Sequence, residues 1–76
     1  MNYERRMELK AIRAELKALS NRIATVKDVE EDILARMSEK DQYGVKGEAY
    51  EYRIDHMITA IDTIKDAILE VEEAAV

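Results

Sequence analysis

The C-terminal part of the chain carries an apolar side chain at every third or fourth position. Between residues 50 and 75 the spacing alternates between four and three without interruption. This is the repeat of a helix that packs one side against another helix along its whole length. The positions are Tyr50, Ile54, Met57, Ile61, Ile64, Ile68, Val71 and Ala75. The pattern predicts a long helix with one straight seam.

A column of small side chains runs beside this seam. Ala60, Ala67 and Ala74 each stand one position before a seam residue. The distance between two packed helices depends on the side chains at their contact, so small residues let a neighbour come close. We therefore expect this helix to face more than one neighbour.

A second series with the same spacing occupies the N-terminal half. Its members are Leu9, Ile12, Leu16, Leu19, Ile23, Val26, Glu30, Ile33 and Met37. Asn2 can cap the start of this helix. Ser20, Asn21 and Thr25 are weak helix formers, so a break near residues 20–27 is an alternative. Because the register continues unchanged through these residues, we predict one continuous helix.

Glu30 is the one charged member of this second series, and two interpretations are open. A buried carboxylate there could set the register of the helices, pair with a basic group or contact a ligand. Alternatively, Val29 and Leu34 shift the buried face locally and leave Glu30 hydrated at its margin. We expect the second.

The only two glycines of the chain, Gly44 and Gly47, mark the turn between the two series. We expect Gly44 to adopt a left-handed conformation at the end of the first helix. The predicted elements are a helix over about 3–42, a turn over about 43–47 and a helix over about 48–74. Two long helices joined by a short turn fold back antiparallel, so the fold class is all-α and residues 1–76 form a single helical-hairpin domain.

The charges are divided unevenly along the chain. Of the net charge of −5, residues 1–27 contribute +4 and residues 28–76 contribute −9. An antiparallel hairpin places the basic segment against the acidic end of the second helix. We expect Arg13 and Lys17 to approach Glu72 and Glu73, with a modest gain for each exposed pair.

One seam between two helices buries little, so a hairpin of this length needs further support. Residues 1–12 are expected to extend past the second helix, which leaves apolar side chains there without an intrachain partner. We predict a homodimer or higher oligomer, built as a four-helix bundle. The residues expected to mediate self-association are Leu9, Ile12, Ile58, Ala60, Ala67 and Ala74.

The composition argues against catalysis. The chain holds no Cys and one His, and it has no phosphate-binding glycine loop, no nucleophile beside a base and no pair of catalytic carboxylates. We expect no enzymatic activity, no cofactor and no metal site. The acidic balance argues against direct nucleic-acid binding. No apolar run approaches the length of a membrane span, and we expect a cytoplasmic location.

We therefore expect a non-enzymatic interaction module, a self-associating hairpin that binds or regulates another protein. A first alternative is a small acidic inhibitor of the kind that phages encode, which would mimic nucleic acid and block a nucleic-acid-binding protein such as a host defence factor. A second is a bundle that holds a small ligand between protomers near Glu30. The candidate contacts for a partner protein are Asp28, Glu31, Asp32, Tyr43, Tyr52 and Asp55.

Overall fold

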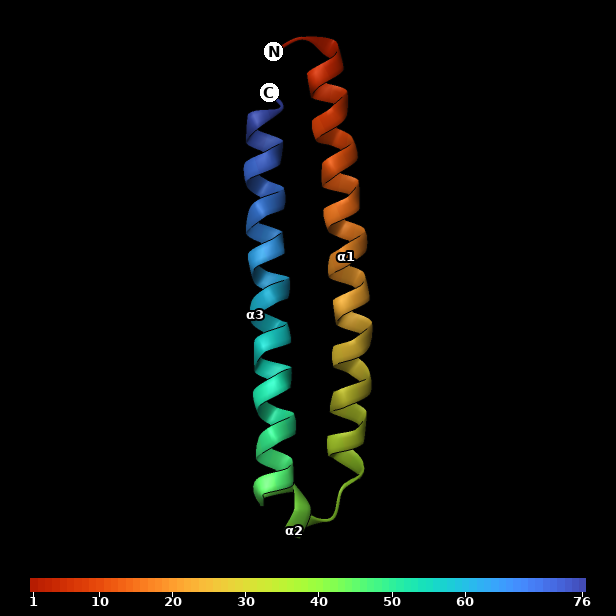
Figure 1. The fold of residues 1–76 in the computed structure, drawn as a ribbon, viewed down its shortest axis with the longest axis vertical. Coiled ribbons are helices and arrows are strands. Elements are labelled where there is room, and N and C mark those ends of the chain that lie inside the picture. The colour runs from red at the N-terminus through yellow and green to blue at the C-terminus, as the bar shows by residue number, and fades with distance from the viewer.

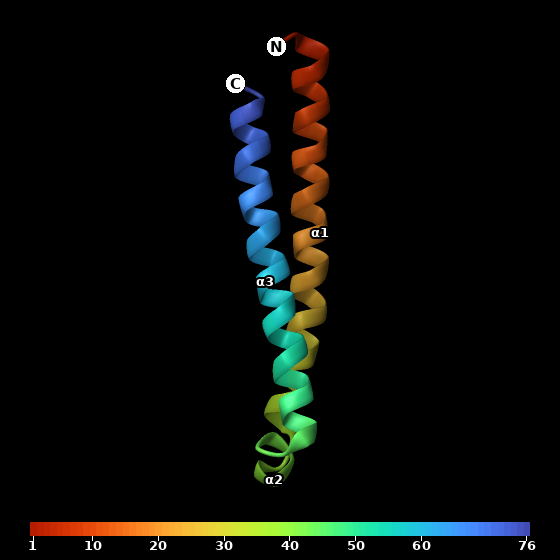
Figure 2. The same cartoon turned by 60° about the vertical axis from the view of Figure 1, so that its left-hand side comes forward.

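Two long antiparallel helices make up nearly all of the molecule (Figure 1). The computed structural model describes residues 1–76, with α1 over Tyr3–Arg36, the short α2 over Glu39–Gln42 and α3 over Val45–Ala74. Both termini lie at the end opposite the turn (Figure 1). Figure 2 shows α3 passing in front of α1 near the turn, so the axes of the two antiparallel helices cross at an angle. The predicted all-α hairpin is confirmed.

The first helix is continuous through residues 20–27, as predicted. The Asn2 side chain accepts a hydrogen bond from the backbone N–H of Arg5 at 2.9 Å and caps the N-terminus. Thr25 directs its hydroxyl to the carbonyl of Asn21, which accommodates a weak helix former inside the helix. An ion pair between Asp32 and Arg36, four residues apart, supports the last turn.

The turn differs from the prediction. α1 ends at Arg36 rather than near residue 42, because Met37 and Ser38 adopt extended backbone conformations. The Ser38 side chain accepts a hydrogen bond from the N–H of Asp41 and starts the separate helix α2. Gly44 was predicted to be left-handed, but its φ is −97° and it is the N-cap of α3, which begins at Val45.

Gly47 fixes the joint between α2 and α3. It lies in the first turn of α3 and is buried against the backbone of α2. A Cβ atom at this position would stand 1.9 Å from the carbonyl oxygen of Gln42, far inside van der Waals contact. The Gln42 side chain in turn donates to the carbonyl of Met37 at 3.0 Å. The glycine therefore permits the close approach that sets where α3 leaves the turn.

The predicted seam of α3 is confirmed. All eight of its members are buried or half-buried, with Ile54 and Ile68 the most enclosed. The side of α1 that meets them is Leu9, Arg13, Leu16, Ser20, Ile23, Lys27, Glu30, Leu34 and Met37. This observed series agrees with the predicted one at every second member, such as Leu9 and Leu16. At the members between them the observed residue is one position later, for example Arg13 in place of Ile12.

The hairpin is extended and encloses little. It measures 58 × 15 × 11 Å, and its radius of gyration is 17.3 Å. A compact domain of this length has a radius of gyration of about 11 Å. Only four residues are buried, and no large side chain is fully enclosed. Neither long helix includes a segment apolar enough to cross a lipid bilayer.

Candidate functional site

The polar residues of the α1 seam are the first sign that the hairpin does not use the best apolar side of α1. Ser20 is 8% exposed, whereas its neighbour Leu19 is 45% exposed. Lys27 is likewise half-buried, whereas Val26 is 55% exposed. The prediction that the column beginning at Ile12 faces α3 is therefore wrong. Arg13 and Lys27 can occupy the seam because their long aliphatic stems cover α3 while their charges reach carboxylates at the edge of the seam. Arg13 reaches Glu72 of α3, and Lys27 reaches Glu31 of α1 itself.

One side of the hairpin, which we call the apolar flank, combines large and small apolar residues. Its α1 column comprises Ile12, Leu19, Val26 and Ile33, each one position before a seam residue. Its α3 column comprises Arg53, Ala60, Ala67 and Ala74. In antiparallel helices such columns lie on the same side of the seam. Leu19, Val26 and Ile33 are all exposed. Leu19, Ile23 and Val26 also line a shallow hollow of about 510 Å³ on this helix.

The opposite side, which we call the charged flank, has a different character. It comprises Lys10, Lys17, Ala24 and Glu31 on α1, and Glu51, Ile58, Lys65 and Glu72 on α3. Six of these eight residues are charged. Ile58 is the one large apolar side chain here and is 41% exposed. Ile58, predicted to mediate self-association with the alanines, therefore lies on the other side of α3 from them.

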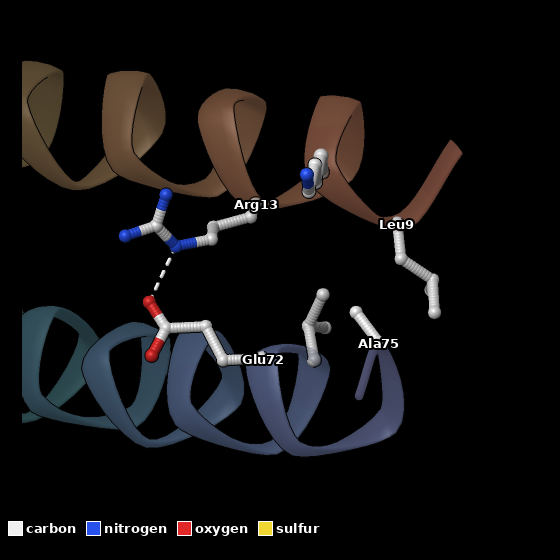
Figure 3. A pocket seen from close by; sticks show the side chains of 6 residues that line it. Leu9, Arg13, Glu72 and Ala75 are labelled. Atoms are coloured by element: carbon white, nitrogen blue, oxygen red, sulfur yellow. Dashed lines mark hydrogen bonds and ion pairs between the residues drawn. The ribbon is translucent and has the colours of Figure 1, made fainter. Parts of the chain in front are cut away.

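A hollow of about 580 Å³ lies at the open end of the charged flank (Figure 3). Arg13 crosses from α1 and pairs with Glu72, as predicted from the charge distribution, whereas Lys17 and Glu73 form no ion pair. Leu9 extends from α1 toward the end of α3 and lines this hollow together with Ala75 (Figure 3). The predicted overhang over residues 1–12 is therefore too long, because Leu9 is half-buried and shares this hollow with Val71 of α3.

Glu30 lies in the seam on the side of the apolar flank, and its predicted hydration is wrong for one of its two oxygens. Its side chain is 24% exposed, but Oε2 is shielded from solvent and has no hydrogen-bond donor. The nearest cation is Nη2 of Arg53 at 3.7 Å, which is an ion pair but too long for a hydrogen bond. The Arg53 guanidinium also stacks 4.3 Å from the ring centre of Tyr50.

The acidic residues named as partner contacts are largely engaged within the chain. Lys27 pairs with Asp28 at 3.1 Å and with Glu31 at 2.7 Å. The hydrogen bond to Glu31, followed by the one to Asp28, raises the pKa of Lys27 above its usual 10.5. Asp32 pairs with Arg36. Of the four acidic candidates only Asp55 has no ion pair.

The two aromatic candidates for partner contacts are exposed, whereas most of the acidic candidates are engaged in ion pairs. Tyr43 lies in the turn and is 82% exposed. Tyr52 faces outward from α3 and packs against His56, with ring centres 4.4 Å apart and ring planes tilted by 58°. Tyr43 and Tyr52 therefore offer an exposed aromatic surface near the turn, whereas Tyr50 belongs to the seam, as expected.

The structure brings together four of the six residues predicted for self-association. Ile12, Ala60, Ala67 and Ala74 share the apolar flank, whereas Leu9 lies in the seam and Ile58 on the charged flank. The sequence pattern predicts Leu19, Val26 and Ile33 inside the hairpin, whereas the structure exposes all three. Their spacing of seven was visible, but spacing alone does not say which neighbour a column faces. Nowhere do three or more His, Cys, Asp or Glu side chains gather as metal ligands.

No protein-family model matches the chain, and neither a curated protein nor a solved structure shows detectable similarity to it. A proposal about its function therefore rests on the geometry of the two flanks.

Proposed function

We propose that the chain is a non-enzymatic interaction module that dimerises through its apolar flank and binds or regulates another protein. The observation that carries this proposal is the exposure of Leu19, Val26 and Ile33 beside a column of alanines. An apolar stripe that runs the length of a hairpin is costly to leave in water. A second copy offers the same stripe and can cover it.

The surface area of the hairpin supports this proposal. It exposes 5860 Å², whereas a compact monomer of the same mass exposes about 4,800 Å². The excess of roughly 1,000 Å² is similar to the 800 Å² or so that each partner buries in an interface of standard size. A dimer formed through one flank would therefore restore a normal degree of burial.

The breadth of the apolar side of α1 also fits a bundle. In a four-helix bundle each helix contacts two neighbours, so its apolar side is wider than a single seam. The α1 residues Leu9, Leu16 and Ile23 face α3, and the column from Ile12 to Ile33 lies beside them. The first set would pack within the hairpin and the second against the other copy.

A dimer of this kind leaves the charged flank and the turn free for a different protein. Tyr43 and Tyr52 are the strongest candidates for contacts there, because tyrosine buries a large area at small entropic cost. The acidic-inhibitor alternative has less support, since Asp28, Glu31 and Asp32 are already paired with cations of their own helix. The alternative of a ligand near Glu30 has less support as well, because Arg53 lies at that position.

Thermal unfolding followed by circular dichroism at several protein concentrations tests the proposal. When folding is coupled to dimerisation, the midpoint rises with concentration by mass action. We expect such a rise over a hundredfold range of concentration. A midpoint that stays constant, with one cooperative transition, would contradict self-association.

A further inference from the structure

We infer that the second copy docks with its turn at the same end of the bundle, so that α1 of each copy lies antiparallel on α3 of its partner. This inference rests on the proposed self-association and specifies its geometry. Two apolar flanks related by a two-fold axis can meet in only two ways. Either the turns share one end and α1 lies on the partner's α3, or the turns are at opposite ends and each helix lies on its own counterpart.

The sizes of the side chains favour the same-end arrangement. The ion pairs Arg13–Glu72 and Glu30–Arg53 show which α1 and α3 residues share a level. On this register Leu19 lies at the level of Ala67, and Val26 at the level of Ala60. When the turns share an end, Leu19 and Val26 each meet an alanine of the partner, whereas Ile33 lies at the level of the partner's Arg53. In the other arrangement α1 lies on α1 and α3 on α3, so large residues meet large ones and alanines meet alanines. The large residues hold the two α1 helices apart, whereas the alanines require the two α3 helices to approach closely.

The charges favour the same arrangement. Residues 1–27 carry +4, and residues 61–76 carry −4. With the turns together, each basic segment lies beside the acidic segment of the partner as well as its own. With the turns apart, α3 lies on α3, and its −4 half meets the half over residues 45–60, which carries −1. Glu15 and Glu70 form a like-charged pair at the rim of the same-end dimer, where water and salt screen the repulsion.

The unpartnered carboxylate oxygen of Glu30 also favours the same-end arrangement. Oε2 is shielded but accepts no hydrogen bond, and Arg53 of its own chain stands 3.7 Å away. In the same-end dimer the partner's α3 presents a second Arg53 at this level of α1. Two Glu30 and two Arg53 side chains can then form a closed ring in which each carboxylate has two guanidinium neighbours, the arrangement that stabilises buried charge.

A distance between spin labels distinguishes the two arrangements. The chain has no Cys, so Tyr43→Cys at the exposed turn gives a single labelling site. Electron double resonance on the labelled dimer should give a distance of about 20–30 Å, set by the spacing of neighbouring helices and the label arms. With the turns at opposite ends, the distance would be about 50 Å, the length of the paired helices.

Charge exchange provides a second test that does not use the turn. Glu30→Arg and Arg53→Glu should each weaken the dimer, because each variant places like charges together. Mixing the two variants should restore association at least tenfold relative to either alone, since every cross-chain pair then combines an acid and a base. The double variant E30R/R53E within one chain serves as the folding control.

Light scattering on the same samples separates failure of the geometry from failure of self-association. A dimeric mass with a long label distance, or with no gain on mixing, overturns the same-end arrangement and leaves the proposed function standing. A monomeric mass overturns both. A dimeric mass with the short distance and the mixing gain supports the ring of Glu30 and Arg53 side chains.

Discussion

The two flanks of the hairpin occupy the same levels of the same two helices but have opposite chemistry. On the charged flank, Lys10 and Lys17 of α1 share a surface with Lys65 and Glu72 of α3, and Ile58 is isolated among them. On the apolar flank, large aliphatic residues of α1 stand beside alanines of α3, and only Arg53 is charged. The proposed dimer accounts for this difference, with the apolar flank as its interface and the charged flank as a surface in water.

The same difference explains the polar residues of the seam. Between α1 and α3, Arg13, Ser20 and Lys27 take places that a self-sufficient hairpin would fill with leucine. These positions lie on the side of the seam toward the charged flank, where their polar groups reach water or carboxylates. The apolar side of α1 is thus centred away from α3 and toward the apolar flank.

The most direct test of the difference between the two flanks is to place a charge on each of them in turn. Leu19 and Ile58 are both large, aliphatic and exposed to a similar degree, so Leu19→Glu and Ile58→Glu form a matched pair. Each buried leucine contributes about 1.5–3 kcal/mol, and the dimer contains two, so Leu19→Glu should weaken dimerisation at least about a hundredfold. Ile58→Glu should leave the dimer unchanged within about twofold.

Sedimentation velocity over a concentration series measures both dissociation constants. Circular dichroism at high concentration shows whether each variant remains helical. Equal weakening by the two substitutions, or loss of the dimer only with Ile58→Glu, would mean that the flanks have been assigned wrongly.

The turn offers a way to disturb the register on which both flanks depend. A Cβ at position 47 would stand 1.9 Å from the Gln42 carbonyl oxygen, a backbone atom that cannot rotate away. Gly47→Ala should therefore destabilise the fold by about 2–3 kcal/mol despite the better helix propensity of alanine. The thermal midpoint should fall by roughly 10 °C or more.

Gly44→Ala is the control for this prediction. The nearest atom to a Cβ at position 44 is the Lys40 carbonyl oxygen at 3.0 Å, and the backbone there suits any residue. Its effect on the midpoint should be clearly smaller. If the two alanine variants have the same thermal midpoint, the close approach at Gly47 does not set the register.

The smallest expected effect concerns the pH dependence of the ion pairs that Lys27 forms at the edge of the charged flank. The pKa of Lys27 is raised above 10.5 by Glu31 and Asp28, so its ion pairs stabilise the folded state below that pH. This contribution is lost as the pH rises through the folded pKa. Lys27→Arg stays charged throughout, so between about pH 9.5 and 11.5 the wild type should lose stability more steeply than the variant. If the thermal midpoints of the wild type and the variant change with pH in parallel, the ionisation of Lys27 contributes nothing to the stability of the fold.

Much of the fold follows from local signals in the sequence. The α3 seam could be predicted because each of its positions is apolar and only one register fits. The cap at Asn2 and the Arg13–Glu72 pair depend on spacing and on antiparallel pairing, which the glycines of the turn already imply. These features need no knowledge of how α1 is rotated about its own axis.

The α1 seam could not be predicted in the same way. Leu9, Leu16 and Ile23 belong to two overlapping series, one continued by Leu19 and Val26 and the other by Ser20 and Lys27. The first is more apolar and was predicted to face α3, yet the hairpin uses the second. The choice depends on packing against α3 and on what covers the remaining side, and neither is a local property of the chain. The end of α1 at Arg36 was missed for a related reason, because the capping role of Ser38 competes with a helix that could have continued.

The central claim is that a second copy of the chain covers the apolar flank, and the mass in solution tests it most directly. Multi-angle light scattering across a concentration series should approach about 17.6 kDa, twice the chain mass of 8.8 kDa. A mass that remains at 8.8 kDa at the highest concentration, with the helices intact, would contradict the claim.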